Sequence, residues 1–125
     1  MPTVGVRYII DDVPAAVAFY TSHLGFTLEL DASPAFAAVS RDGVRLLLSG
    51  DGSSGKRPLR DGRRQVPGGF NRIHLEVADL ESEVVRLRTA GVRFRTDEIV
   101  KGPGGAQIVI EDPSGNPVEL FQPQR

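Results

Sequence analysis

Cysteine is absent from this 125-residue sequence, and its absence limits both the fold and the chemistry. Without cysteine the chain has no disulfides, no thiolate metal ligands and no cysteine nucleophile, so its fold depends on packing alone. A fold of this kind suits a reducing cytoplasm, where we expect the protein to be located. The length corresponds to one domain that can bury a hydrophobic core without covalent cross-links.

A strong net charge is also lacking, because 15 Lys and Arg residues stand against 16 Asp and Glu residues and give a formal charge of −1. Such a chain has no general electrostatic attraction to nucleic acid or to an anionic membrane. No apolar run is long enough to cross a bilayer, and the opening residues lack the basic start and apolar run of a signal peptide. We therefore expect neither nucleic acid nor a membrane as a partner.

The beginning of the sequence predicts a strand followed by a capped helix. Residues 4–10 (VGVRYII) have the composition of a buried strand. Asp12 then offers a side-chain oxygen to the first turn of a helix, and apolar residues at helical spacing place that helix near residues 13–24. Gly25 is suited to ending it.

The same plan returns in the second half of the chain. Residues 71–77 (NRIHLEV) predict a strand, Asp79 a helix cap, residues 80–90 a helix and Gly91 its end. After each helix come three strand-like segments separated by turn residues. These segments are FTLEL, FAAVS and VRLLL in the first half, and VRFRTDEIV, AQIVI and PVELF in the second.

This duplication predicts an α+β fold made of two βαβββ modules. Module one covers residues 3–50, a connecting loop 51–69 and module two 70–123, together forming one domain over 1–125. A module of this size leaves one apolar sheet face open, so two modules are expected to bury these faces together and enclose a trough. The modules can pair within one chain or across two chains. We expect a homodimer, because the sheets have edges that need cover.

The connecting loop is rich in Gly, Ser, Pro and Arg and has neither helical nor strand periodicity. Loops of this length are either functional covers or mobile linkers. As a cover, its basic residues would face an anionic ligand, and as a linker they would keep the segment solvated. These residues are Lys56, Arg57, Arg60, Arg63 and Arg64.

Three phrases carry a family resemblance: IDDVPAAVAFYTSHLGF, LEVADLESEVVRLRTAGV and EDPSGNPVELFQP. They resemble the vicinal oxygen chelate superfamily, which contains glyoxalase I, extradiol dioxygenases, fosfomycin-modifying enzymes and the bleomycin resistance proteins. The resemblance covers essentially the whole chain and implies the two-module fold. It implies no single reaction, because this superfamily supports several unrelated chemistries on one scaffold.

Metal-dependent members of that superfamily draw their ligands, usually His, Gln or Glu, from the first and last strands of each module. The resemblance places the first-strand ligands seven residues before the helix caps, at Gly5 and Arg72, and the last-strand ligands near Leu46 and at Glu119. Of these, only Glu119 is a metal-binding residue type. One carboxylate beside a permanent guanidinium cation cannot replace the water shell of a divalent ion. We therefore expect no metal and no cofactor.

His74 lies two residues beyond Arg72 and so shares its face of the predicted strand. One interpretation is a histidine of the cavity wall that is hydrogen-bonded to a neighbour. A second is a residue that contacts ligand or transfers a proton, since imidazole titrates near neutral pH. A third is a metal site shared with Glu119, although a His-Glu pair completed by waters is a poor one.

Arg72 and Glu119 also have two interpretations, and both predict that the two side chains are close. The cation and the carboxylate can replace the absent metal, either by pairing or by sharing a polar ligand, or they can form an ordinary structural ion pair. Side chains alternate between the two faces of a strand, and this alternation turns further residues of the predicted strands toward the trough. They supply polar groups, an apolar wall and an aromatic edge. The expected ligand-binding set is Arg7, Leu46, Leu48, Arg72, His74, Glu119 and Phe121.

Two functions fit this set. The first is a metal-independent binding protein of the bleomycin-resistance type, which sequesters a small aromatic or polar natural product or antibiotic. The second is a lyase, isomerase or dioxygenase-type enzyme that uses His74 and Glu119 as acid and base, with or without a divalent metal.

Overall fold

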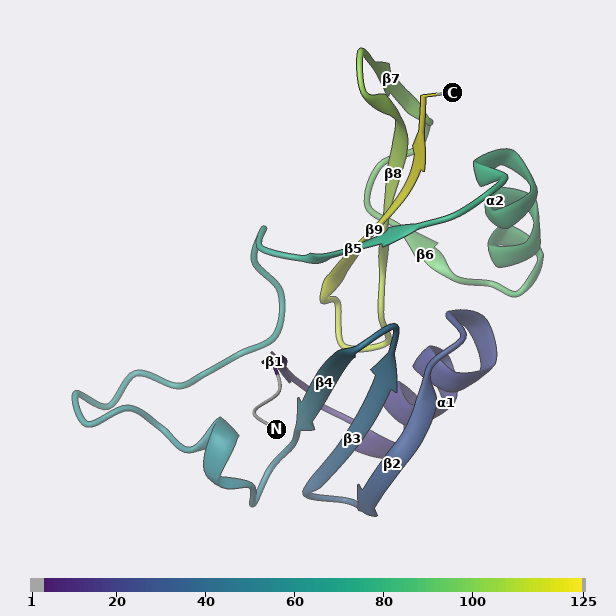
Figure 1. The fold of residues 1–125 in the computed structure, drawn as a ribbon. Helices are drawn as coiled ribbons and strands as arrows, with labels where there is room; N and C mark the ends of the chain where they lie inside the picture. Colours follow the sequence, from purple (N-terminus) through teal and green to yellow (C-terminus); the bar gives the residue numbers. More distant parts are fainter. Residues whose placement is uncertain (1–3, 125) are drawn as a thin grey trace. The chain divides into compact units, whose positions relative to one another are not determined.

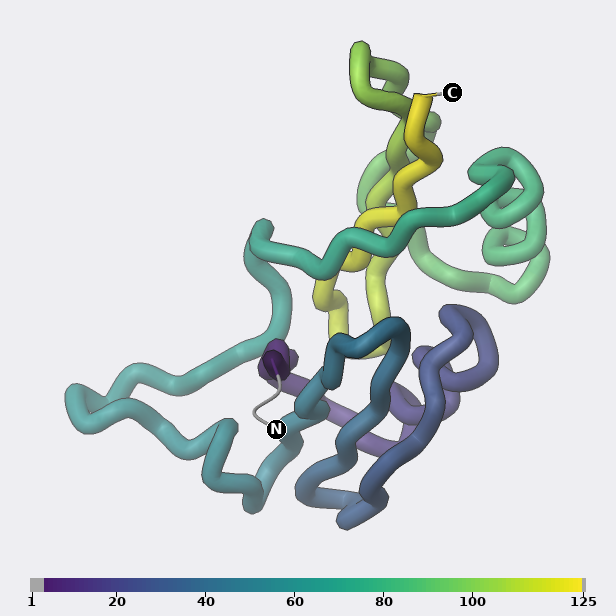
Figure 2. Tube along the Cα trace, viewed as in Figure 1, coloured from purple at the N-terminus to yellow at the C-terminus, as the bar shows by residue number. Residues whose placement is uncertain are grey.

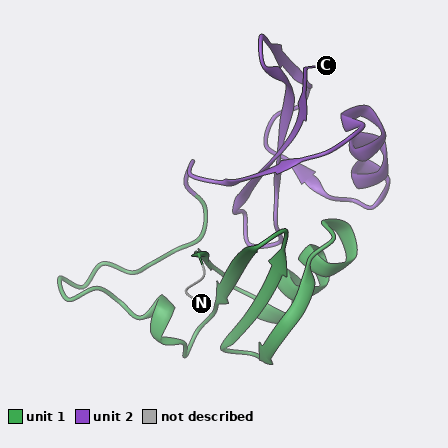
Figure 3. Cartoon of the chain, in the orientation of Figure 1, with its two compact units in different colours: residues 1–68 green, residues 69–125 purple. Residues whose placement is uncertain are grey.

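The structure is a computed structural model that describes residues 4–124. The chain divides into two compact units, residues 1–68 and residues 69–125 (Figure 3). Within the described residues, no helix has the length and apolar character needed to cross a membrane.

The first unit is a four-stranded sheet with one long helix (Figure 1). Its elements are β1 (Val4–Ile9), α1 (Val13–His23), β2 (Thr27–Ala32), β3 (Phe36–Arg41), β4 (Val44–Ser49) and the short helix η1 (Ser54–Lys56). The strand order is β1-β4-β3-β2, in which β1 is parallel to β4 and the other neighbours are antiparallel. Helix α1 packs on β2, β3 and β4.

The second unit repeats this plan around a five-stranded sheet. Its elements are β5 (Ile73–Glu76), α2 (Leu80–Thr89), β6 (Arg93–Phe94), β7 (Val100–Gly102), β8 (Gly105–Glu111) and β9 (Pro117–Pro123). The order is β5-β9-β8-β6, with β7 also paired to β8, and β5 is parallel to β9. The predicted α+β fold with two repeated modules is therefore confirmed.

Both helices begin at the predicted residue and end one residue before the predicted one. Asp12 accepts a hydrogen bond from the backbone N–H three residues later at 3.1 Å, and Asp79 does the same at 3.2 Å. The Ser82 hydroxyl also donates to Asp79 at 2.7 Å, and this bond, with the Ser82 backbone N–H, holds the Asp79 pKa below its usual value. Gly25 and Gly91 end the helices with φ of 71° and 81°, a left-handed conformation that glycine adopts without strain.

Each unit has its own apolar core between helix and sheet. In the first, the Tyr20 ring of α1 packs edge-on against Tyr8 and Phe26, with centroids 6.5 and 5.5 Å apart. In the second, Leu80 and Leu87 of α2 are fully buried. Strands β8 and β9 complete that core with Ile108, Ile110, Val118 and Leu120. Much of the helix-facing side of each sheet is thus filled by the side chains of its own core.

The segment from Val92 to Val100, which predicts one strand, is divided into β6 and β7. The backbone N–H groups of Arg95 and Thr96 both donate to the Val109 carbonyl, at 2.8 and 3.3 Å. The Thr96 hydroxyl then accepts from the Val109 N–H at 3.0 Å, in place of a backbone carbonyl. This side-chain contact interrupts the ladder, so the pairing resumes only at β7.

The segment after β4 forms a short helix and a turn. Helix η1 contacts β1 and β4. Further along, the Leu59 N–H donates to the Arg63 carbonyl and the Gly62 N–H donates to the Leu59 carbonyl, both at 2.9 Å. These bonds close a turn, and Figure 2 shows the chain doubling back there.

Candidate functional site

The register of β5 and β9 brings polar side chains onto one face of the second sheet. His74 lies opposite Glu119, and Glu76 lies opposite Phe121. Paired residues on neighbouring strands point to the same face, so these four side chains share one side of the sheet. On β9 the alternate residues Val118 and Leu120 point to the helix side and are buried.

Arg72 and Glu119 form the ion pair that the sequence predicts. Arg72 precedes β5, and its Nε and Nη2 both lie 3.0 Å from Oε1 of Glu119. The Glu119 side chain is only 11% exposed and that of Arg72 is 30% exposed. A carboxylate this deep needs a partner, and the guanidinium provides the main one. Arg72 also donates to the Phe70 carbonyl through Nη1, at 3.4 Å.

His74 lies on the other side of the same carboxylate. Its Nε2 is 3.7 Å from Oε2 of Glu119, so the two carboxylate oxygens face different partners. The imidazole is also 4.7 Å from the Phe121 ring, centroid to centroid, with the planes inclined by 39°. With 47% of its side chain exposed, His74 remains accessible to a ligand. Arg72, Glu119, His74 and Phe121 thus form one contiguous cluster, called here the Glu119 cluster.

The Glu119 cluster contains few metal donors. Among the described residues, no group of three or more His, Asp or Glu side chains is arranged to hold a metal ion. Within the cluster only Glu119 and His74 belong to ligand types, and the nearest charge to Glu119 is a guanidinium, which repels a cation. The residues present do not fit the metal site that the superfamily implies.

A second ion pair in this unit was not expected from the sequence. Arg95 Nε lies 3.0 Å from Oε2 of Glu111. The same guanidinium donates to the Gly115 carbonyl at 3.0 Å and to the Gly69 carbonyl. The alternating charges of VRFRTDE were the available signal, but the partner became evident only from the pairing of β6 with β8. Arg95 therefore ties the start of the unit to the turn between β8 and β9.

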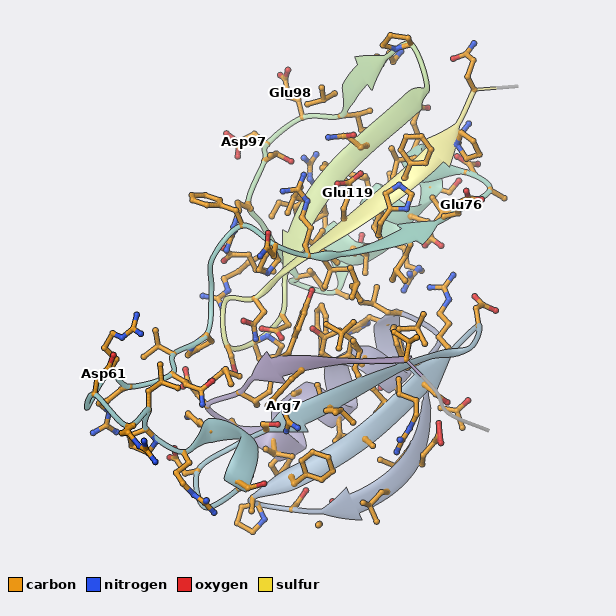
Figure 4. The ribbon with its side chains drawn as sticks, turned by 60° about the vertical axis from the view of Figure 1, so that its left-hand side comes forward. Arg7, Asp61, Glu76, Asp97, Glu98 and Glu119 are labelled. Carbon is orange, nitrogen blue, oxygen red and sulfur yellow. The ribbon has the colours of Figure 1, made fainter. Side chains whose placement is uncertain are left out.

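The first unit contains the remaining predicted site residues. Arg7 is exposed on β1, and its Nη1 donates to the Ser49 hydroxyl at 2.8 Å (Figure 4). The guanidinium also lies against η1, so closely that a Cβ on Gly55 would be 2.0 Å from Nη1. Helix η1 therefore restricts how far Arg7 can move.

The placement of Leu46 and Leu48 corrects the expectation that they share a face with Arg7. In the parallel pairing of β1 with β4, Arg7 lies opposite Leu47, whereas Leu48 lies opposite Tyr8. Leu46 and Leu48 are fully buried and therefore belong to the face that α1 covers. The difference is a shift of one residue in register, which reverses the direction of every side chain.

The second unit also contains a cavity of about 540 Å³ that does not coincide with the Glu119 cluster. It lies between the beginning of α2 and the β7–β8 hairpin. Its lining is Asp79, Leu80, Glu81, Ile99, Lys101, Gly102, Gly105, Ala106, Gln122, Pro123 and Gln124. The backbone N–H of Leu80 already donates to the Gln122 side chain at 2.8 Å, so this N–H at the beginning of α2 has a partner within the protein. None of the four residues of the Glu119 cluster lines this cavity.

Comparison with known families identifies the class of protein. Residues 4–120 match the Glyoxalase/Bleomycin resistance protein/Dioxygenase superfamily, and the chain belongs to that superfamily. It is 30% identical to UcmS2, whose crystal structure superposes with a TM-score of 0.72 over 97% of each chain. No curated protein matches the sequence.

Two more distant structures share the fold. TnmS3, an antibiotic binding protein from Streptomyces sp. CB03234, is 23% identical with a TM-score of 0.72, over 99% of this chain and 97% of TnmS3. Lactoylglutathione lyase from Agrobacterium tumefaciens is 21% identical with a TM-score of 0.74, over 97% of this chain and 92% of the lyase. At such identities the likeness concerns the fold alone, and one fold here carries a binding protein and an enzyme.

Proposed function

We propose that this protein binds a small molecule without a metal and sequesters a natural product such as an antibiotic in the cytoplasm. The observation that carries the proposal is the pairing of Arg72 with Glu119 at 3.0 Å. Glu119 is the single residue of ligand type at the four positions that the family resemblance marks, and a permanent cation already holds it. A divalent ion would have to displace that cation, and the cluster would offer it only His74 as a second protein ligand.

The chemistry of the Glu119 cluster favours a flat, partly polar ligand. His74 and Phe121 present two neighbouring rings, with which a planar aromatic molecule can stack. Arg72 lies beside them and supplies N–H donors for an oxygen acceptor on the ligand edge. Arg7 of the first unit stays a prediction from the sequence. Leu46 and Leu48 are fully buried and are not part of the proposed contact set.

A homodimer is also proposed, supported by the exposed edge of the first sheet. Strand β2 lies at that edge, with Leu28 and Leu30 41% and 51% exposed. Apolar side chains on an edge strand are a common site of association between chains. Sedimentation of wild type should give the mass of two chains, and Leu30→Glu should shift it toward one. A wild-type monomer at micromolar concentration would contradict this proposal.

Elemental analysis of purified protein, followed by ligand titration, tests whether the protein binds its ligand without a metal. We expect no stoichiometric zinc, nickel, manganese or iron. Emodin, a planar polyphenol, and bleomycin serve as probes in fluorescence titrations with and without a chelator. Binding should survive chelation and should weaken about 10- to 100-fold in Arg72→Met, the effect of losing one or two charge-assisted hydrogen bonds. Arg86→Met on the outer face of α2 is the matched control and should bind normally.

An enzyme is the second candidate, and one contact favours it. Nε2 of His74 lies 3.7 Å from Oε2 of Glu119, so that two groups able to act as acid and base are side by side. Turnover of the methylglyoxal–glutathione hemithioacetal by wild type, lost in His74→Gln, would establish this function. A stoichiometric metal that is needed for such turnover would replace the leading proposal.

A further inference from the structure

The start of the connecting segment is fixed to the first unit by one lysine. Lys56 is 13% exposed at its side chain, and its Nζ donates to the Ile10 carbonyl at 3.0 Å. The same ammonium lies 2.9 Å from an Asp51 carboxylate oxygen and 3.6 Å from one of Asp11. Its positive charge is therefore matched within the fold, and it acts as an anchor rather than as a free cation.

A glutamine closes the other end of the segment. The Gln65 side-chain amide donates to the Gly55 carbonyl at 3.2 Å and to the Arg57 carbonyl at 2.8 Å. The Ser53 hydroxyl donates to the Gly50 carbonyl at 2.6 Å. These bonds hold η1 and the returning chain together, and they leave a space between the two.

That space is a cavity of about 280 Å³ with an excess of positive charge. It is lined by Asp51, Gly52, Ser53, Lys56, Arg57, Pro58, Arg64 and Gln65. The lining thus includes three cationic residues and one carboxylate, and that carboxylate is already paired with Lys56. Arg57 and Arg64 have no ion-pair partner among residues 4–124, whereas Arg63 is paired with Asp61 at 2.8 Å.

We propose that this cavity is a binding site for a tetrahedral oxyanionic group, phosphate or sulfate, either free or carried by a small molecule. The two unmatched guanidinium groups balance a dianion, and each presents a fork of N–H donors that fits its oxygens. A solvated linker would not need the hydrogen bonds and ion pairs that hold both ends of the connecting segment around this space. The site uses none of the residues of the Glu119 cluster and does not depend on the function proposed for it.

The test is a titration of the full-length protein with inorganic phosphate and with phenyl phosphate, at constant ionic strength maintained with chloride. Amide resonances of Gly52, Ser53 and Gln65 should shift in a saturable manner. Equal affinity for both probes identifies a free anion as the ligand, and higher affinity for phenyl phosphate identifies a carried group. The absence of any saturable shift at millimolar probe would overturn the proposal without any variant being made.

Three single substitutions in the same segment provide the matched comparison. Arg57→Gln and Arg64→Gln should each weaken phosphate binding about fivefold or more, since each removes a charge-assisted contact. Arg60→Gln removes the same charge from a residue that does not line the cavity, and should change affinity less than about twofold. Equal losses in all three variants would overturn the proposal, because they would indicate general attraction by the segment. Thermal unfolding of each variant checks that the fold is retained.

Discussion

Replacing Arg72 by Met tests the Glu119 cluster directly. The substitution keeps much of the side-chain length and removes the cation, leaving the carboxylate of Glu119 with His74 as its nearest neighbour. Breaking a fully buried ion pair costs about 3–5 kcal/mol, but the Arg72 side chain is 30% exposed, so water can replace part of the interaction. We expect a loss of about 2 kcal/mol in the free energy of unfolding, which lowers the melting temperature by about 8 °C.

A double-mutant cycle separates the pair from its surroundings. Urea unfolding of wild type, Arg72→Met, Glu119→Gln and the double mutant should give a coupling energy of about 1–2 kcal/mol. The control cycle uses Glu83 and Arg86, an exposed pair on α2 whose atoms are 2.7 Å apart. Exposed helical pairs of this type couple by about 0.3–0.5 kcal/mol. A coupling at Arg72 no larger than the control would refute the reasoning.

The same four proteins distinguish a binding site from a structural ion pair. If the pair orients a ligand, the coupling between Arg72 and Glu119 should appear both in the affinity for emodin and in the free energy of unfolding. Coupling in stability alone, with wild-type affinity in Arg72→Met, would assign the pair to the fold and remove it from the site.

Two further predictions concern the second unit. Gly105→Ala should destabilise the protein by about 2–3 kcal/mol in urea unfolding, because Gly105 has a φ of 152° and an added Cβ would lie 2.2 Å from the Gln122 carbonyl oxygen. Gly104→Ala is the control and should cost little, because no atom lies within 4 Å of the added Cβ. Equal destabilisation by the two substitutions would contradict the argument. The Asp79 pKa is lowered mainly by the Ser82 hydroxyl, so its contribution to stability is present above pH 3.8 and is lost as the pH falls through the folded pKa. Asp79→Ala should therefore lower the melting temperature at pH 6 and have a smaller effect in strong acid, and a loss independent of pH would count against this cap.

The helices could be predicted because their limits depend on local interactions. Asp12 and Asp79 bond to amide groups three residues away, and Gly25 and Gly91 adopt positive φ whatever surrounds them. No distant contact is needed for either effect. The proximity of Arg72 to Glu119 was predictable for a different reason, since the family resemblance marks both as ligand positions of one module and a buried charge needs a partner.

The direction of side chains in the first unit could not be predicted in the same way. Which of Leu46, Leu47 and Leu48 lies beside Arg7 depends on the register between β1 and β4, two strands that are distant in the sequence. Three successive leucines contain no alternation, so the pattern does not select a register. The burial of Tyr8 against α1 fixes it in the structure.

The two Arg-Glu pairs of the second unit differ in a way that bears on function. Arg95 is held by Glu111 and by the carbonyls of Gly69 and Gly115, so moving it would break contacts with three separate groups. Arg72 has one strong partner, a single oxygen of Glu119, and one contact of 3.4 Å with a backbone carbonyl. A ligand oxygen can replace that weaker contact at little cost, because the ion pair remains in place. The ion pair that is less constrained by the backbone is thus the one beside the exposed His74 and the half-buried Phe121, which is why we propose it, and not Arg95 with Glu111, as the ligand-binding pair.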